Sequence, residues 1–156
     1  MSKKVIDLLN KARAAELGAI LQYMDHHYEL ADSDFGKLAK ILKATAIQEM
    51  KHAEALAERI LYLGGTPMYK PEGEVKKGQE IAAMLATDIA LEESAVKMYN
   101  DSAQSCVEAG DHVSKDLFET LLADEEGHLD AFQNIADHVK KLGASYLATQ
   151  TGGAAE

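Results

Sequence analysis

Two Glu-x-x-His motifs occur in the sequence at positions related by one offset. Glu49 and His52 form the first motif and Glu125 and His128 form the second, so the offset is 76 residues for both pairs (49 to 125 and 52 to 128). Residues three apart on a helix project side by side, so each motif places a carboxylate next to an imidazole. A mixed oxygen and nitrogen set of this kind suits iron or manganese better than calcium.

The same offset relates two further pairs, Glu16 with Glu92 and Tyr23 with Tyr99. In each half the two glutamates are 33 residues apart (16 to 49 and 92 to 125), and their midpoints fall at expected turns. Residues equidistant from the turn of an antiparallel hairpin lie at one height, so the four glutamates are expected on one level. Six residues are therefore predicted to be metal ligands and the residues that carry the chemistry: Glu16, Glu49, His52, Glu92, Glu125 and His128.

Charge favours two metal ions over a metal-free bundle. Each of these glutamates shares a helix face with apolar residues, and burying a carboxylate costs several kcal/mol unless a counter-charge offsets the lost solvation. Apart from Arg13, one turn from Glu16, no Lys or Arg occupies a matching position. Two divalent cations would balance four carboxylates. Tyr23 and Tyr99, seven residues after Glu16 and Glu92, are interpreted either as core aromatics or as hydrogen-bond donors that orient the carboxylates.

Four amphipathic helices are needed to position these residues, and apolar periodicity predicts them over residues 3–31, 35–63, 79–109 and 112–142. Residues 32–34 (DSD) are expected to supply a turn and an N-cap, and Gly110 and Asp111 a break and a cap. Residues 64–78 are expected to form one long crossover between two antiparallel hairpins. Residues 144–148 are predicted to form a short fifth helix and residues 149–156 a frayed tail. The fold class is thus an all-α four-helix bundle, in one domain spanning residues 1–156.

Composition limits the partners. The net charge of −10 disfavours nucleic acid, and no stretch approaches the roughly 20 apolar residues of a membrane span. Cys106 is the only cysteine, which excludes a disulfide within the chain and cysteine-based zinc or iron–sulfur sites, and a reducing cytoplasm is expected. Cys106 itself is interpreted as a small buried or half-exposed residue. The remaining histidines lack the motif spacing and are expected on the surface: His26, His27, His112 and His138.

The chain resembles the bacterioferritins over nearly its whole length. The resemblance rests on residues 15–23 (AELGAILQY), 49–54 (EMKHAE), 58–61 (ERIL) and 124–128 (DEEGH). It implies a ferritin-like bundle with two iron ions per subunit, in which Fe²⁺ is oxidised by O₂ or peroxide and stored as ferric mineral. It also implies a homo-oligomeric cage of twenty-four subunits built from two-fold dimers. A haem shared between two subunits would be held by Met50 of each, and a ferredoxin-type protein would be the reductant.

The sequence departs from some bacterioferritins at Ala44 and Gln48, where those proteins carry a His and an Asp that serve an iron site on the inner surface. Such an auxiliary site is therefore not expected here. The leading alternative is a di-iron or di-manganese redox enzyme without storage, such as a rubrerythrin-like peroxidase, a catalase or an oxygenase. The single cysteine argues against the cysteine-rich iron domain that rubrerythrins add. A DNA-protecting mini-ferritin places its ligands across subunits and is disfavoured by the acidic surface.

Overall fold

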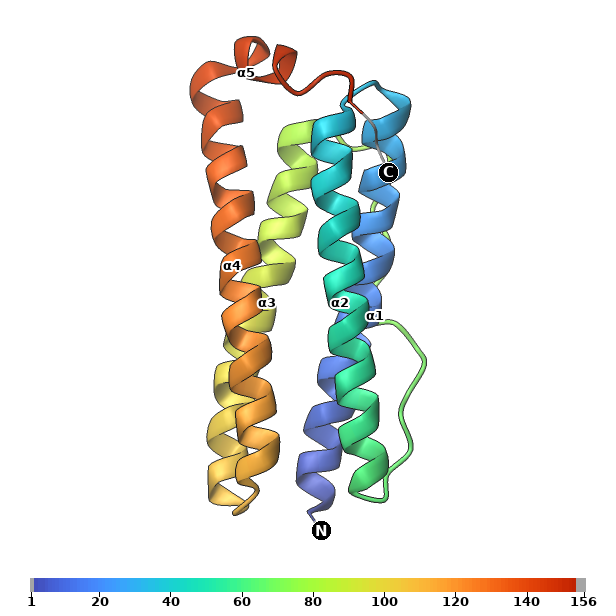
Figure 1. The fold of residues 1–156 in the computed structure, drawn as a ribbon, viewed down its shortest axis with the longest axis vertical. Coiled ribbons are helices and arrows are strands. Elements are labelled where there is room, and N and C mark those ends of the chain that lie inside the picture. Colours follow the sequence, from blue (N-terminus) through green and yellow to red (C-terminus); the bar gives the residue numbers. More distant parts are fainter. Residues whose placement is uncertain (1, 154–156) are drawn as a thin grey trace.

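Four long helices form the body of the molecule, paired as two antiparallel hairpins that are joined by a long crossover (Figure 1). The structure, a computed structural model, describes residues 2–153, and no strand occurs among them. The elements, in chain order, are α1 (Lys3–Asp32), α2 (Gly36–Tyr62), α3 (Ile81–Glu108), α4 (His112–Leu142) and the short α5 (Ala144–Ala148). The predicted bounds differ from these by two residues at most. The all-α bundle with a short fifth helix is confirmed.

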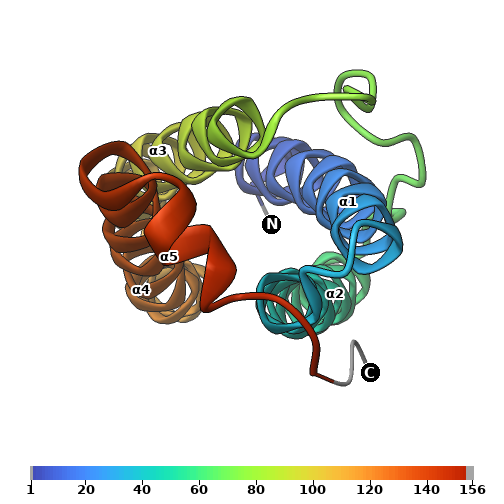
Figure 2. The same cartoon turned by 90° about the horizontal axis from the view of Figure 1, so that it is seen from above.

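Seen along the bundle axis, the helices surround a common core and α5 lies across one end (Figure 2). The core consists of two apolar clusters, one at each end of the bundle. The first includes Leu9, Ile60 and Phe118, and the second includes Leu42 and Phe132. Positions 16, 49, 92 and 125 fall between these clusters along their helices. Each long helix therefore places one carboxylate in a polar layer between two apolar ones.

The turn between α1 and α2 differs from the prediction. The expected N-cap within residues 32–34 is wrong, because Phe35 occupies the N-cap position and its side chain makes no capping hydrogen bond. Instead, the turn closes the end of α1: Asp34 has a φ of 65°, and the N–H groups of Asp34 and Phe35 donate to the carbonyls of Ala31 and Leu30. This is the Schellman arrangement, which satisfies helix-terminal carbonyls. At the other turn Asp111 caps α4 as predicted, accepting from the Ser114 N–H at 3.0 Å.

The long crossover between α2 and α3 is confirmed, and it is held against α1. The Glu72 N–H donates to the carbonyl of Ala14 at 2.9 Å. Further along, the amide of Gln22 donates to the Lys76 carbonyl and accepts from the Lys76 N–H, at 2.9 and 2.8 Å. Gly18 permits this approach, because a Cβ there would collide with the backbone carbonyl of Glu72. The crossover therefore lies directly over α1 at the height of the polar layer.

The tail after α5 is not frayed as far as the structure describes it. The Gly152 N–H donates to the carbonyl of Asp34 at 2.8 Å, and the Lys37 ammonium donates to the carbonyl of Thr149 at 3.0 Å. Gly36 allows the contact, because a Cβ there would meet the carbonyl oxygens of the tail. The frayed-tail prediction is thus wrong for residues 149–153, and its remainder, residues 154–156, lies outside the described residues. Within residues 2–153 no helix is both long and apolar enough to cross a membrane.

Replacing Gly18 with Ala should destabilise the protein, because the new methyl group must displace the crossover backbone. We expect a loss of about 1–3 kcal/mol, the usual cost of overpacking. Gly127→Ala is the matched control, since Gly127 is also helical but nothing lies within 4 Å of the added Cβ. That change should stabilise α4 by up to about 1 kcal/mol through helix propensity. Thermal unfolding of the two variants should shift in opposite directions; equal shifts would contradict the close packing of the crossover.

Candidate metal centre

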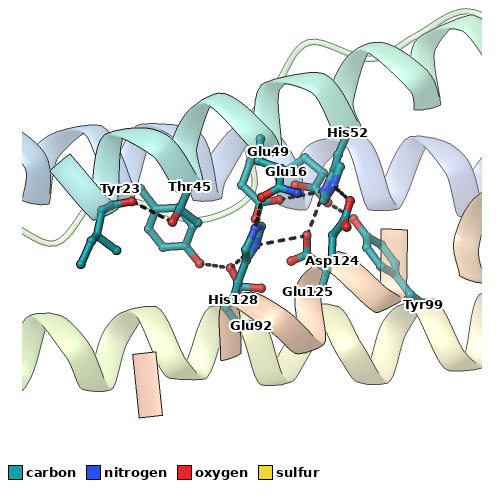
Figure 3. A network of polar contacts seen from close by, with 12 residues as sticks. Glu16, Tyr23, Thr45, Glu49, His52, Glu92, Tyr99, Asp124, Glu125 and His128 are labelled. Atoms are coloured by element: carbon teal, nitrogen blue, oxygen red, sulfur yellow. Dashed lines mark hydrogen bonds and ion pairs between the residues drawn. The ribbon is translucent and has the colours of Figure 1, made fainter. Parts of the chain in front are cut away.

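The six residues predicted as metal ligands meet in the middle of the bundle (Figure 3). They fall into two overlapping groups, and within each group the ligand atoms all lie within 4.8 Å of one another. Glu49 and Glu125 belong to both groups. The first group adds Glu16 and His52, and the second adds Glu92 and His128. Two carboxylates shared between two sets of donors are suited to bridging a pair of cations.

Both imidazoles turn the same nitrogen towards the carboxylates. The Nδ1 atom of His52 lies 2.9 Å from Glu125 Oε1, 3.1 Å from Glu49 Oε2 and 3.4 Å from Glu16 Oε1. The Nδ1 atom of His128 lies 2.6 Å from Glu49 Oε1 and 3.5 Å from Glu92 Oε1. The two rings stack with their centroids 6.1 Å apart. Each histidine therefore offers Nδ1 to the centre and leaves Nε2 for an outer partner.

Each of the four carboxylates keeps one oxygen without a hydrogen-bond partner. All four side chains are at most 3 % exposed, and the unpartnered atoms are Oε2 of Glu16 and Glu92 and Oε1 of Glu49 and Glu125. The Nδ1 atom of His128 is also unpartnered, since its short contact with Glu49 lacks hydrogen-bonding alignment. Buried polar atoms are rarely left without partners in folded proteins. Two metal ions would take up these atoms, so the donor set fits a two-metal centre.

Basic side chains do not supply the missing counter-charge. Arg13, the one candidate from the sequence, turns away from the centre and donates to the carbonyls of Ala53 and Met68 at 2.5 and 2.9 Å. Burial raises the pKa of Glu49 to about 10 and that of Glu125 to about 11. Burial also works to lower the pKa of His52, but the surrounding carboxylates raise it above its usual range. Without cations, burial therefore favours the protonated, neutral forms of Glu49 and Glu125.

Two tyrosines hold the carboxylates of Glu16 and Glu92 from the side. The Tyr23 hydroxyl donates to Glu92 Oε1 at 2.6 Å, and the Tyr99 hydroxyl donates to Glu16 Oε1. In both carboxylates the oxygen that the tyrosine leaves free is the unpartnered Oε2. Burial, followed by the adjacent carboxylate, raises the pKa of both phenols well above the usual value, so both remain protonated donors. The tyrosines thus fix one oxygen of each carboxylate and leave the other for a cation.

The expected surface location is wrong for two of the four remaining histidines. His26 and His27 are both buried, whereas His112 and His138 are exposed as expected. The His26 Nδ1 atom pairs with Asp88 at 3.0 Å, which offsets the effect of burial and raises the His26 pKa. His27 Nδ1 lies 2.6 Å from the carbonyl of Ala39. Helix periodicity could have placed His26 in the core, because it follows the core residue Tyr23 by three positions and so lies on the same helix face.

Comparison with known proteins places the chain in a family. The model of the ferritin-like domain matches residues 6–142. A bacterioferritin from Desulfovibrio desulfuricans is 46% identical over 149 residues, covering 96% of this chain and 83% of the relative. A bacterioferritin from Brucella melitensis is 40% identical over 140 residues, covering 90% and 87%. The chain belongs to the bacterioferritin family. The X-ray structure of the Desulfovibrio desulfuricans bacterioferritin, which describes its diiron site in different catalytic states, superimposes with a TM-score of 0.96 at 45% identity, covering 98% of this chain and 90% of that one.

In the present chain, a cavity of about 210 Å³ adjoins the candidate metal centre on the side of α1 and α3. Its inner wall includes Glu16, Glu92 and Glu125, and its outer rim is formed by Glu72 and Gly73 of the crossover. Ions can approach the carboxylates from this side. The opposite side, between α2 and α4, is occupied by the two histidines. Cys106 is buried far along α3 in the first apolar cluster, as expected of a small core residue.

Loading the centre with a redox-inert cation should stabilise the protein. A ligand at 100 times its Kd adds about 2.7 kcal/mol, so Co²⁺ should raise the unfolding temperature by several degrees. In the variant Glu49→Ala/Glu125→Ala this shift should vanish. The metal-free variant should be at least as stable as the metal-free parent, because two buried carboxylates are gone. Differential scanning calorimetry with Co²⁺, and with Mg²⁺ as the control cation, measures both effects. A parent protein indifferent to Co²⁺ would rule out a two-metal centre.

Proposed function

We propose that this bacterioferritin oxidises Fe²⁺ with O₂ or peroxide at a two-iron ferroxidase centre and stores the ferric product as mineral inside an oligomeric cage. The ligands would be Glu16, Glu49, His52, Glu92, Glu125 and His128. The observation that carries the proposal is the overlap of the two donor groups through Glu49 and Glu125. Two Fe²⁺ ions bound side by side can each give up one electron, so the oxidant receives electrons in pairs.

In this reaction the protein would position the carboxylate ligands and exclude bulk water from the centre. Glu49 and Glu125 belong to both donor groups and would help to hold both ions, whereas Glu16 and Glu92 would each hold one. The phenols of Tyr23 and Tyr99 hold the latter two carboxylates in place through one oxygen each. The apolar clusters on both sides of the polar layer exclude bulk water along the bundle axis. Substrate Fe²⁺ would enter through the cavity beneath the crossover.

Met50 supports the haem part of the proposal. It lies on α2 between Glu49 and His52 in sequence, yet 45% of it is exposed, because it projects from the opposite side of the helix. Ile47, three residues earlier on the same face, is 42% exposed. These side chains form an apolar strip suited to the two-fold contact of a dimer, where a haem would take Met50 from each subunit. A cage of twenty-four subunits, a ferredoxin-type reductant and a cytoplasmic location complete the proposal.

Removing either terminal carboxylate should abolish fast iron oxidation. In Glu16→Ala and in Glu92→Ala we expect the ferroxidase rate to fall by at least about 100-fold, because losing an outer partner of a metal ligand already costs 10–100-fold. Stopped-flow absorbance after aerobic addition of two Fe²⁺ per subunit measures this rate. Glu93→Ala is the matched control, since Glu93 is exposed on the same helix as Glu92. A parent-like rate in either ligand variant would contradict the assignment.

Haem binding by Met50 predicts a visible spectrum that depends on that residue. The purified protein should show a Soret band and a native mass near twenty-four times 16.9 kDa. Met50→Leu should lose the Soret band while keeping the volume of the side chain. Met98→Leu, which changes a half-buried methionine on α3, should retain it. A colourless parent protein that migrates as a dimer would refute both the haem and the cage.

A further inference from the structure

The outer partners of the two histidines differ in charge. Asp124 on α4 accepts from His52 Nε2 on α2 at 2.9 Å, and Gln48 Oε1 on α2 accepts from His128 Nε2 on α4 at 2.6 Å. Gln48 and Asp124 obey the same 76-residue offset as the ligands (48 to 124), and each directly precedes a Glu-x-x-His motif. The two hydrogen bonds therefore cross the bundle reciprocally. One acceptor is a carboxylate, and the other is a neutral amide.

We propose that Asp124 and Gln48 make the two metal positions unequal, so that a cation binds more tightly at His52 and Glu16 than at His128 and Glu92. This inference rests on the proposed function, because it concerns the same two-metal centre. Asp124 and Gln48 are positioning residues, since they act on the metal only through the histidines. Figure 3 shows Asp124 reaching His52 from the side away from the carboxylates.

The outer partners of the two histidines differ in charge and not in the ring nitrogen that they contact. Both acceptors take the Nε2 hydrogen, which fixes the same tautomer and leaves Nδ1 free to bind a cation on each side. A carboxylate accepts this hydrogen more strongly than an amide and shifts electron density towards Nδ1, which makes His52 the stronger donor. The negative charge of Asp124 also attracts the cation directly. Because 40% of its side chain is exposed, water weakens this attraction, and we expect an effect of about tenfold, the low end of the range for outer partners.

The direct donors of the centre and their tyrosine partners are matched between its halves. Each position has one terminal glutamate, and each of these accepts a hydrogen bond from one tyrosine. The shared glutamates belong to both donor groups. A further difference points the same way as the charge, since the side chain of His128 is 10% exposed and that of His52 only 4%. The weaker position at His128 is therefore also the one that can exchange its ion more readily.

Crystals grown with one Co²⁺ per subunit test the inference, because a single ion must choose between the positions and repulsion between two ions does not enter. Anomalous scattering should place the ion at Glu16 and His52 with an occupancy about ten times that at Glu92 and His128. Gln48→Asp should bring the two occupancies close to equality. The double variant Gln48→Asp/Asp124→Gln should reverse the preference. Glu93→Ala, an exposed change on α3, is the control and should keep the parent ratio.

Two results separate this inference from the proposed function. Equal occupancies in the parent, or a parent-like ratio in Gln48→Asp, would overturn the inequality and leave the two-metal centre intact. Absence of Co²⁺ from both positions would overturn the centre itself. If Gln48→Asp does not fold, Asp124→Asn carries the same test, because it removes the charge with almost no change of shape. In that variant the ratio should fall close to one, and a persistent tenfold preference would refute the role of the charge.

Discussion

The burial of four carboxylates on one level of an apolar bundle is the constraint on which the structure depends. In the described part of the chain no Lys or Arg side chain faces them, and the cationic groups within reach are the two imidazoles. Protons or metal ions must therefore supply the balance. If protons supply it, some of the glutamates are neutral carboxylic acids, and each carboxyl group still has a buried oxygen without a partner. Two cations would balance these charges and take up the unpartnered oxygens.

This constraint also explains the arrangement of the helices. Each long helix contributes one glutamate at the same height, and the second half of the chain repeats the first with an offset of 76 residues. Two such hairpins can face each other only if a long segment returns the chain from the end of α2 to the start of α3. The crossover does this along α1, where Gly18 lets its backbone come close. It consequently covers the cavity that leads to the carboxylates.

Regular patterns made most of the fold and the ligand cluster predictable from sequence. Periodicity located the helices, and the equal spacing of Glu16, Glu49, Glu92 and Glu125 located the polar layer. The errors arose where no repeat was available: His26 and His27 were placed by their lack of motif spacing and not by their helix face. Residues 149–153 and the turn at Asp34 depend on backbone hydrogen bonds, which side-chain patterns do not reveal. Asp124 and Gln48 escaped notice as partners because each contacts a histidine on the opposite hairpin.

The centre has two different sides, and a bundle that both binds and releases iron would benefit from the difference. On the side of α1 and α3 a cavity reaches the carboxylates beneath the crossover. On the side of α2 and α4 the stacked histidines close the layer, and their outer hydrogen bonds run to Asp124 and Gln48. Two equally strong outer bonds would retain both ions alike. With a neutral amide as the outer partner of His128, one ion would be able to leave while the other keeps the carboxylates organised for the next.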